Sequence, residues 1–176
     1  MHENAVTPVP PATSRTQSEN SGTSGTSGTV ASREPRPRGA VAIITNDFGE
    51  LLLHLRDDIE GIAWPGHWSL LGGGCDPGEE PAWAITRELD EEAGLDVDSL
   101  IYLFEAVDED GSGQRITFFS AHWDGDEQAL PLAEGVKLQF FAPEHLHTLT
   151  IPPFIRDGID RHQRARASAR RRYPRV

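Results

Sequence analysis

The chain has 176 residues and a formal net charge of −12 at pH 7, with 37% hydrophobic and 25% charged residues. This length suits one domain better than two, and the modest apolar share indicates that part of the chain lies outside any packed core. A strongly acidic chain repels nucleic-acid backbones and anionic lipid surfaces, and no run of about 18 apolar residues offers a membrane span, which argues against both classes of partner.

The N-terminal segment, residues 1–38, consists mainly of Ser, Thr, Gly and Pro and repeats SGTSGTSGT between Ser21 and Thr29. Such a segment has too few apolar side chains to offset the entropy lost on ordering it. We therefore expect a disordered tail at 1–38 and an ordered domain at 39–162. The arginine-rich remainder, 163–176, is expected to be a basic C-terminal tail.

The first part of the expected domain is typical of β structure. Apolar runs at 40–46 and 50–56 are separated by the short segment 47–49, which predicts a hairpin. A loop rich in Asp, Gly and Pro follows at 57–67. The next segment, 67–73, predicts a third strand that enters a glycine turn.

An amphipathic helix is expected at 80–93. Pro81 suits the first turn of a helix, and Gly94 suits its end because glycine readily adopts the left-handed conformation that stops a helix. Apolar residues recur at intervals of three and four, the spacing of one helix face: Ala82, Ile85, Leu89 and Ala93.

Strands and helices are intermixed in the second half as well. Strands at 100–107 and 115–123 flank a turn at 108–113, which predicts a second hairpin. The last expected elements are a strand at 136–142, a short helix at 143–149 and a terminal helix at 152–162. The fold class predicted from this order is α/β, with helices layered on a mixed sheet.

The helix at 80–93 is crowded with acid near its C-terminal end, at Glu88, Asp90, Glu91 and Glu92. The helix macrodipole disfavours negative charge at that end, and like charges one turn apart repel each other. All but Asp90 fall on one sector away from the apolar face. The cluster is either a solvated acidic face or a site for a hard divalent cation, which prefers oxygen ligands.

The spacing of residues 73–95 favours the cation site. In order, the chain has Gly73, five residues, Glu79, seven residues, Arg87, Glu88, Leu89, one residue, Glu91, Glu92, one residue, Gly94 and Leu95. This pattern resembles the Nudix box, G-x5-E-x7-R-E-U-x-E-E-x-G-U with U a bulky aliphatic residue, at every constrained position. The resemblance extends loosely over about residues 39–160 and implies an α/β/α sandwich that hydrolyses a diphosphate linkage in a nucleoside diphosphate joined to another group.

The resemblance also implies a metal site. It makes Glu88, Glu91 and Glu92 the metal ligands and catalytic carboxylates, and the carbonyl of Gly73 a further ligand. The implied cofactor is Mg²⁺, for which Mn²⁺ can substitute.

Other positions of the box have supporting roles in the family. Arg87 is expected to orient the acidic cluster, with Glu79 as its ion-pair partner, and Gly94 to make a structural turn. Outside the box, Glu134 matches a late loop carboxylate that binds metal or acts as general base in some members; the alternative is a loop acid with neither role.

Three further residues are candidates for substrate binding. Arg56 matches a position where related nucleotide hydrolases place a basic residue near the phosphates, or else it is a surface arginine at a strand end. Trp64 and Trp68 either stack on a base or pack at the core, and packing is the expectation for at least one of them.

The substrate remains open between two classes. The chain has no SQPWPFP-like array of the kind found in NADH hydrolases, and no proline about fifteen residues past the box, which is frequent in ADP-ribose hydrolases. A MutT-like pyrophosphohydrolase of (deoxy)nucleoside triphosphates ranks first. A hydrolase of a nucleotide sugar or a special metabolite is the alternative.

Two hypotheses that do not involve catalysis remain. A non-catalytic Nudix-like nucleotide-binding module would typically lack box glutamates, and all are present here. A nucleic-acid role could rest on the seven arginines between 161 and 176, but the acidic body disfavours it. The expected partner is therefore a small nucleotide, for a monomer or a homodimer. A lone cysteine, Cys75, and no signal-like N-terminus favour the cytoplasm.

Overall fold

The structure is a computed structural model that describes residues 37–172, except for the side chain of Arg170. Apart from Pro37 and Arg38, the predicted N-terminal tail therefore lies outside the described residues, as do the last four residues of the predicted basic tail. Within 37–172 we find no helix that combines the length and apolar character needed to cross a membrane.

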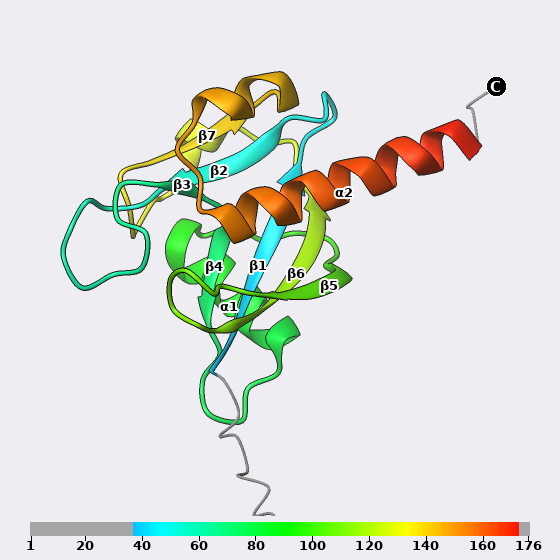
Figure 1. The fold of residues 1–176 in the computed structure, drawn as a ribbon. Helices are drawn as coiled ribbons and strands as arrows, with labels where there is room; N and C mark the ends of the chain where they lie inside the picture. Colours follow the sequence, from blue (N-terminus) through cyan, green and yellow to red (C-terminus); the bar gives the residue numbers. More distant parts are fainter. Residues whose placement is uncertain (1–36, 173–176) are drawn as a thin grey trace, which may run out of the picture. The chain divides into compact units, whose positions relative to one another are not determined.

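A seven-stranded mixed sheet forms the centre of the domain (Figure 1). Strand β1 runs parallel to β6, and the other strand pairs are antiparallel. The strands are β1 Arg38–Thr45, β2 Leu51–Leu55, β3 Trp68–Ser69, β4 Leu71–Gly74, β5 Ile101–Val107, β6 Arg115–His122 and β7 Lys137–Phe141. The helices are α1 Pro81–Ala93 and α2 Pro153–Arg172, with short 3-10 turns at Glu127–Ala129 and Pro143–Thr148.

The two long helices cover opposite faces of the sheet. Side chains of successive strand residues point to opposite faces, and β1 divides accordingly: Ala42 and Ile44 pack in one buried cluster, Val41 and Ile43 in the other. The first cluster contains Ala84, Ile85, Leu89 and Ala93 of α1, and the second contains Ile155 and Ile159 of α2. Ala82, which was predicted on the apolar face of α1, is exposed. This arrangement confirms the predicted α/β/α sandwich.

The first predicted hairpin is present, but its two strands pair only next to the turn. Strands β1 and β2 share only the pair Thr45↔Leu51, after which β1 pairs with β4 and β6, and β2 pairs with β3 and β7. Both strands are almost continuously buried, as expected for strands covered on both faces and flanked on both edges. The strand predicted at 67–73 divides at Leu70 into β3 and β4, which pair with different partners.

The helix and the second hairpin agree with the sequence. Helix α1 has Pro81 in its first turn and ends at Gly94, whose φ of 56° is left-handed and whose N–H donates to the carbonyl of Asp90. Strands β5 and β6 pair across the predicted turn, with a bulge between Tyr102 and Phe104.

The terminal helix is longer than predicted. It was expected to end at 162, but α2 continues to Arg172, so residues 163–172 are helical and do not begin a tail. This stretch contains no Gly or Pro, and its Ala, Gln and Arg residues favour helix. Its arginines also lie near the C-terminal end of the helix, where positive charge is stabilising.

Candidate functional site

The glycines of β4 lie directly against the acidic face of α1. A Cβ atom at Gly73 would lie 2.6 Å from the carboxylate carbon of Glu88, so a side chain at position 73 would displace that carboxylate. The neighbouring N–H of Gly72 donates to Oε2 of Glu92 at 3.0 Å. Gly72 has a φ of +131° and lies against the backbone of Ala40, so it too has no room for a side chain.

Arg87 is hydrogen-bonded to three of the four glutamates of the box: Glu79, Glu88 and Glu91. Its guanidinium donates to both carboxylate oxygens of Glu79, at 3.1 and 3.0 Å. Its Nη1 donates to Glu88 at 3.0 Å and to Glu91 at 2.8 Å. Bidentate arginine pairs fix geometry as well as charge, and the hydrogen bonds from Arg87 hold the pKa of Glu79 below its usual range. The ion pair expected between Arg87 and Glu79 is present.

Two of the helix carboxylates are poorly solvated. Glu92 is only 5% exposed, and burial raises its pKa to about 8. The hydrogen bond from the Gly72 N–H lowers this pKa but does not offset the effect of burial. Burial also raises the pKa of Glu88. The negative charges of Glu88 and Glu134 contribute to the shift of Glu92, and that of Glu134 to the shift of Glu88. These carboxylates form one electrostatic cluster, including Glu134, which is 42 residues beyond Glu92 in the chain.

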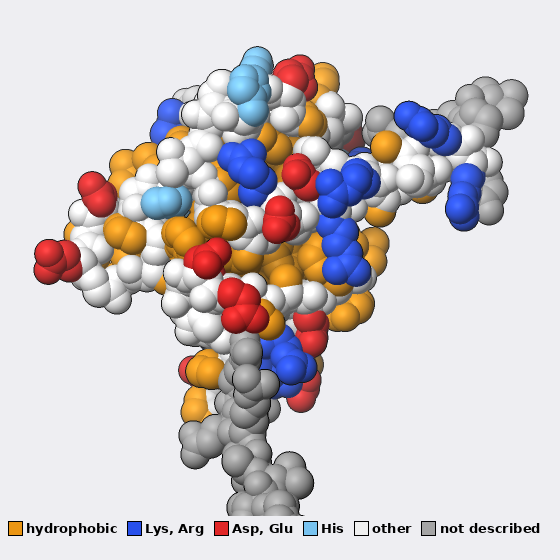
Figure 2. Space-filling model, viewed as in Figure 1, with side chains coloured by type: hydrophobic (Ala, Val, Ile, Leu, Met, Phe, Trp, Pro, Cys, Tyr) orange, Lys and Arg blue, Asp and Glu red, His pale blue; other side chains and the backbone are white. Residues whose placement is uncertain are grey.

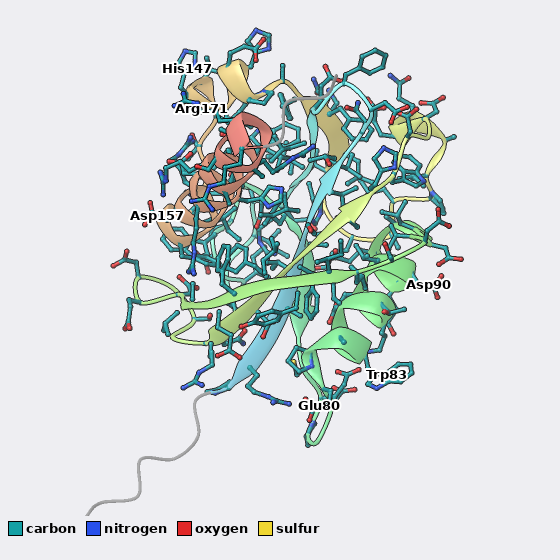
Figure 3. The ribbon with its side chains drawn as sticks, turned by 90° about the vertical axis from the view of Figure 1, so that its right-hand side faces the viewer. Glu80, Trp83, Asp90, His147, Asp157 and Arg171 are labelled. Carbon is teal, nitrogen blue, oxygen red and sulfur yellow. The ribbon has the colours of Figure 1, made fainter. Side chains whose placement is uncertain are left out.

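Asp90, the fourth acid of this helix half, lies apart from the cluster. It is exposed, and Figure 3 shows Asp90 and Trp83 on the side of α1 that faces away from the sheet. Only the three box glutamates therefore lie toward β4 and Arg87. Asp90 provides an internal comparison, since it carries the same charge on the same helix.

The segment that carries Glu134 is held beside α1 by its backbone. The carbonyl of Glu134 accepts a hydrogen bond at 2.9 Å from Nε2 of His54, a residue of β2 that is 1% exposed. Backbone N–H groups of the same segment donate to three other places: Ala133 to the Glu92 carbonyl, Gly135 to the Asp57 carboxylate and Val136 to the Leu55 carbonyl. Glu134 itself is exposed.

His54 was not predicted from the sequence. It lies within the apolar run of the second strand, where only its position among buried neighbours distinguishes it from a solvent-facing residue. Gly135, with a φ of +83°, packs its backbone directly on the His54 ring. The pair therefore sets the position of the loop that carries Glu134.

A cavity of about 200 Å³ adjoins the glycines of β4. Arg56 and Trp64 both line it, together with Gly72, Gly73 and Gly74. Trp68 does not: it is half-buried and packs edge-on against Phe141, with ring centroids 4.8 Å apart. The two candidate tryptophans thus separate into one pocket residue and one packing residue.

Trp64 is hydrogen-bonded to the buried carboxylate of Asp108, a residue that the sequence pattern placed only in a turn. The φ of Trp64, 55°, is unusual for a residue other than glycine, and its indole N–H lies 3.2 Å from Oδ2 of Asp108. Asp108 is 2% exposed and also accepts hydrogen bonds from the backbone N–H and hydroxyl of Ser112. These bonds join the 57–67 loop to the β5–β6 turn across the cavity.

The chemistry of the donor set fits a hard divalent cation. Glu88 and Glu92 of α1 present carboxylate oxygens to the backbone of Gly73 and Gly72, and the Glu91 carboxylate is hydrogen-bonded to Arg87. Within 37–172, no group of three or more His, Cys, Asp and Glu side chains is arranged to hold a metal ion. Glu88 and Glu91 instead share the Arg87 guanidinium.

Comparisons with known proteins identify similar sequences and a shared fold. The family model described as the NUDIX domain matches residues 35–161. Over 52 residues the chain is 46% identical to the nucleoside triphosphatase NudI of Escherichia coli, a match that covers 30% of this chain. The matched segment spans 36% of the length of that relative.

Solved structures share the fold. The MutT protein from Methanosarcina mazei Go1 has 24% sequence identity and a TM-score of 0.56, over 75% of this chain and 96% of that one. The NUDIX domain of Shewanella oneidensis NrtR, solved with ADP-ribose, has 14% identity and a TM-score of 0.63, over 76% and 90%.

Proposed function

The chain belongs to the NUDIX domain family, and on that premise we propose that it is a divalent-metal-dependent hydrolase of a diphosphate linkage in a nucleotide. The observation that carries the proposal is the packing of Glu88 and Glu92 against Gly73 and Gly72, which joins two poorly solvated carboxylates to a glycine backbone.

The residues that would hold the metal are Glu88, Glu91 and Glu92, with the carbonyl of Gly73. Mg²⁺ fits these oxygen donors, and Mn²⁺ fits them as a substitute. Such an ion neutralises the charge of diphosphate oxygens and lowers the pKa of a bound water. Arg87 is a positioning residue, because its bonds to Glu79 fix the place from which it contacts Glu88 and Glu91.

The reaction we infer is attack of water on one phosphorus. The water oxygen forms a bond to that phosphorus, the anhydride P–O bond breaks, and a carboxylate takes the proton. We assign that carboxylate to Glu134, because its charge belongs to the cluster and its backbone is anchored to His54. The products are a nucleotide and a phosphorylated group, or pyrophosphate when the substrate is a triphosphate.

Substrate binding is assigned to the cavity beside β4. Arg56 would contact the phosphates and Trp64 would stack on a base. Trp68 is left out of this set because it packs on Phe141. The similarity to a nucleoside triphosphatase over 52 residues supports a (deoxy)nucleoside triphosphate as substrate. The fold shared with a domain solved with ADP-ribose supports the alternative, a nucleotide sugar or other nucleoside diphosphate derivative.

The test is a substrate panel with a paired substitution. Nucleoside triphosphates, nucleotide sugars and dinucleotides are incubated with Mg²⁺ or Mn²⁺, and products are identified by mass. Glu92→Gln should lower turnover by about 100-fold or more, whereas Asp90→Asn, which removes the same charge from the outer side of α1, should not. Near-normal turnover of a folded Glu92→Gln variant refutes the site. A wild type that binds nucleotide without turning it over indicates a binding module instead.

A further inference from the structure

A second cavity, of about 320 Å³, lies beside α2 at the opposite end of β1 from the acidic cluster. It is bounded by the end of β1, the β1–β2 turn, the start of the 3-10 turn at Pro143 and one face of α2. Ala40 of β1 pairs with Gly73, and Thr45, which lines the cavity, is five residues further along the strand. At about 3.3 Å per residue the two sites are about 16 Å apart, so one small ligand cannot occupy both.

Two buried polar atoms at this cavity have no hydrogen-bond partner within the described part of the chain. They are Nε2 of His162 and Nε2 of Gln163, on consecutive residues of α2 that both line the cavity. Buried polar groups in folded proteins are almost always paired, because an unpaired one loses its bonds to water without replacement. A pair of such atoms at one cavity therefore points to a ligand that bonds them.

A positive charge lies beside these atoms. Arg166, one turn further along α2, lines the same cavity and donates to the hydroxyl of Thr45 at 3.3 Å. It forms no ion pair with any carboxylate of residues 37–172, and one bond leaves most of its five N–H donors available. Figure 2 shows basic side chains following α2 on this face of the domain. Burial and the charge of Arg166 lower the pKa of His162, so its imidazole is neutral near pH 7 and can donate through Nε2.

The rest of the cavity wall is apolar and lacks acid. Leu51, Pro143 and Ala167 line it, and Phe48, 86% exposed, lies on the turn at its rim. No described Asp or Glu lines it, although the chain as a whole carries an excess of acid. The donors select a negatively charged group and the walls select a short apolar body. The volume falls at the lower end of the range for small-molecule pockets, about 300–1,000 Å³.

We propose that this cavity binds a small organic carboxylate with an aromatic or branched aliphatic body, held by Arg166, Gln163 and His162. The carboxylate accepts from the guanidinium and, after the His162 and Gln163 side chains rotate toward the cavity, from their two unpaired N–H donors. The apolar body lies between Leu51 and Ala167. The site is separate from the diphosphate site and does not depend on its chemistry.

Benzoate is the probe for this site, titrated into the full chain by calorimetry and by NMR, with benzamide as its uncharged counterpart. Benzoate should bind saturably at one site in the millimolar range or tighter, and benzamide at least about tenfold more weakly. Equal binding of benzamide, or the absence of saturable benzoate binding, overturns the proposal. If inorganic phosphate binds as tightly as benzoate, the proposed role of the apolar wall is wrong.

Three substitutions locate the bound carboxylate. Arg166→Gln should weaken benzoate at least about tenfold, and Gln163→Glu should do so by repulsion even if Arg166 has a structural role. Arg164→Gln, an exposed position of the same helix that does not line the cavity, should leave binding unchanged. Glu92→Gln should also leave it unchanged. Benzoate affinity that falls with Glu92→Gln and not with Arg166→Gln would place the ligand at the other site and contradict the proposal.

Discussion

Glu92 and Asp90 are two residues apart on α1 and experience different environments. Glu92 is buried, accepts a hydrogen bond from Gly72 and has its pKa raised to about 8. Asp90 is exposed on the outer side of the helix (Figure 3). The chain therefore contains a matched pair of acids that separates the effect of burial at the site from the effect of charge on the helix.

This difference predicts a pH-dependent stability. Because the pKa of Glu92 rises from 4.5 to about 8 on folding, the folded protein binds an extra proton between these values. This extra proton stabilises the folded protein. The stabilisation is complete below about pH 4.5 and is lost as the pH rises toward 8. In EDTA at pH 8, Glu92→Gln should be more stable than wild type by about 4 kcal/mol. Urea unfolding at pH 5 and pH 8 measures this, with Asp90→Asn as control; equal pH dependence in wild type and Glu92→Gln would contradict it.

Glu79 acts at a distance from the reacting atoms. It holds Arg87 through two hydrogen bonds, and Arg87 in turn contacts Glu88 and Glu91. Glu79→Gln should therefore keep the fold and lower metal affinity and kcat by about 10- to 100-fold, as loss of such supporting residues does elsewhere. Steady-state kinetics at increasing Mg²⁺ checks this, and excess Mg²⁺ should restore part of the loss. Unchanged metal dependence would show that Arg87 needs no such anchor.

Much of the arrangement of elements follows from local pattern. The periodic apolar face, Pro81 and Gly94 predicted α1 within about one residue, and the box spacing predicted which helix acids lie together. Strand partners were less accessible: β1 and β2 are so uniformly apolar that no alternation reveals their neighbours, and their pairing with β4 and β6, and with β3 and β7, was not predicted. His54 and Asp108 were missed because their roles depend on contacts with residues 80 and 44 positions away.

The packing of β4 on α1 predicts different outcomes for neighbouring glycines. At Gly73 a Cβ would meet the Glu88 carboxylate at 2.6 Å, whereas at Gly74 it would meet nothing within 4 Å. Gly73→Ala should lower turnover about 100-fold by displacing that carboxylate. Gly74→Ala, where the added Cβ meets no protein atom, should lower turnover far less. Kinetics of both variants, with circular dichroism to confirm folding, makes the comparison; equal losses would indicate a general disturbance of the strand.

At the scale of the whole chain, the charge is unevenly distributed. The net charge is −12, yet seven arginines occur from residue 161 onward. Two of them are used within the domain: Arg161 lies 4.0 Å over the Phe104 ring and Arg166 donates to Thr45. The described side chains beyond Arg166 are exposed. Arg161 and Arg166 thus contact the domain, and the acidic charge of the chain as a whole disfavours a nucleic-acid site at the remaining arginines.

Removal of residues 167–176 tests that interpretation. The deletion keeps Arg161 and Arg166, so kcat and KM for the best substrate should be unchanged, and neither form should bind RNA or DNA at physiological salt. Filter binding and steady-state kinetics on the two forms give the answer. Nucleic-acid binding by the full chain that disappears on truncation would support a second role for the arginines.

Mapping where a divalent cation binds tests most directly whether Glu88, Glu91 and Glu92 hold the metal. Mn²⁺ added in small amounts to the isotope-labelled protein broadens NMR signals near its binding site. If the box glutamates hold the ion, the amides of 72–74 and of the C-terminal half of α1 should broaden first, and Mg²⁺ should compete. Glu92→Gln should weaken the effect, and Asp90→Asn should not. Broadening elsewhere on the acidic surface, or equal broadening in both variants, would contradict the claim that these carboxylates hold the metal.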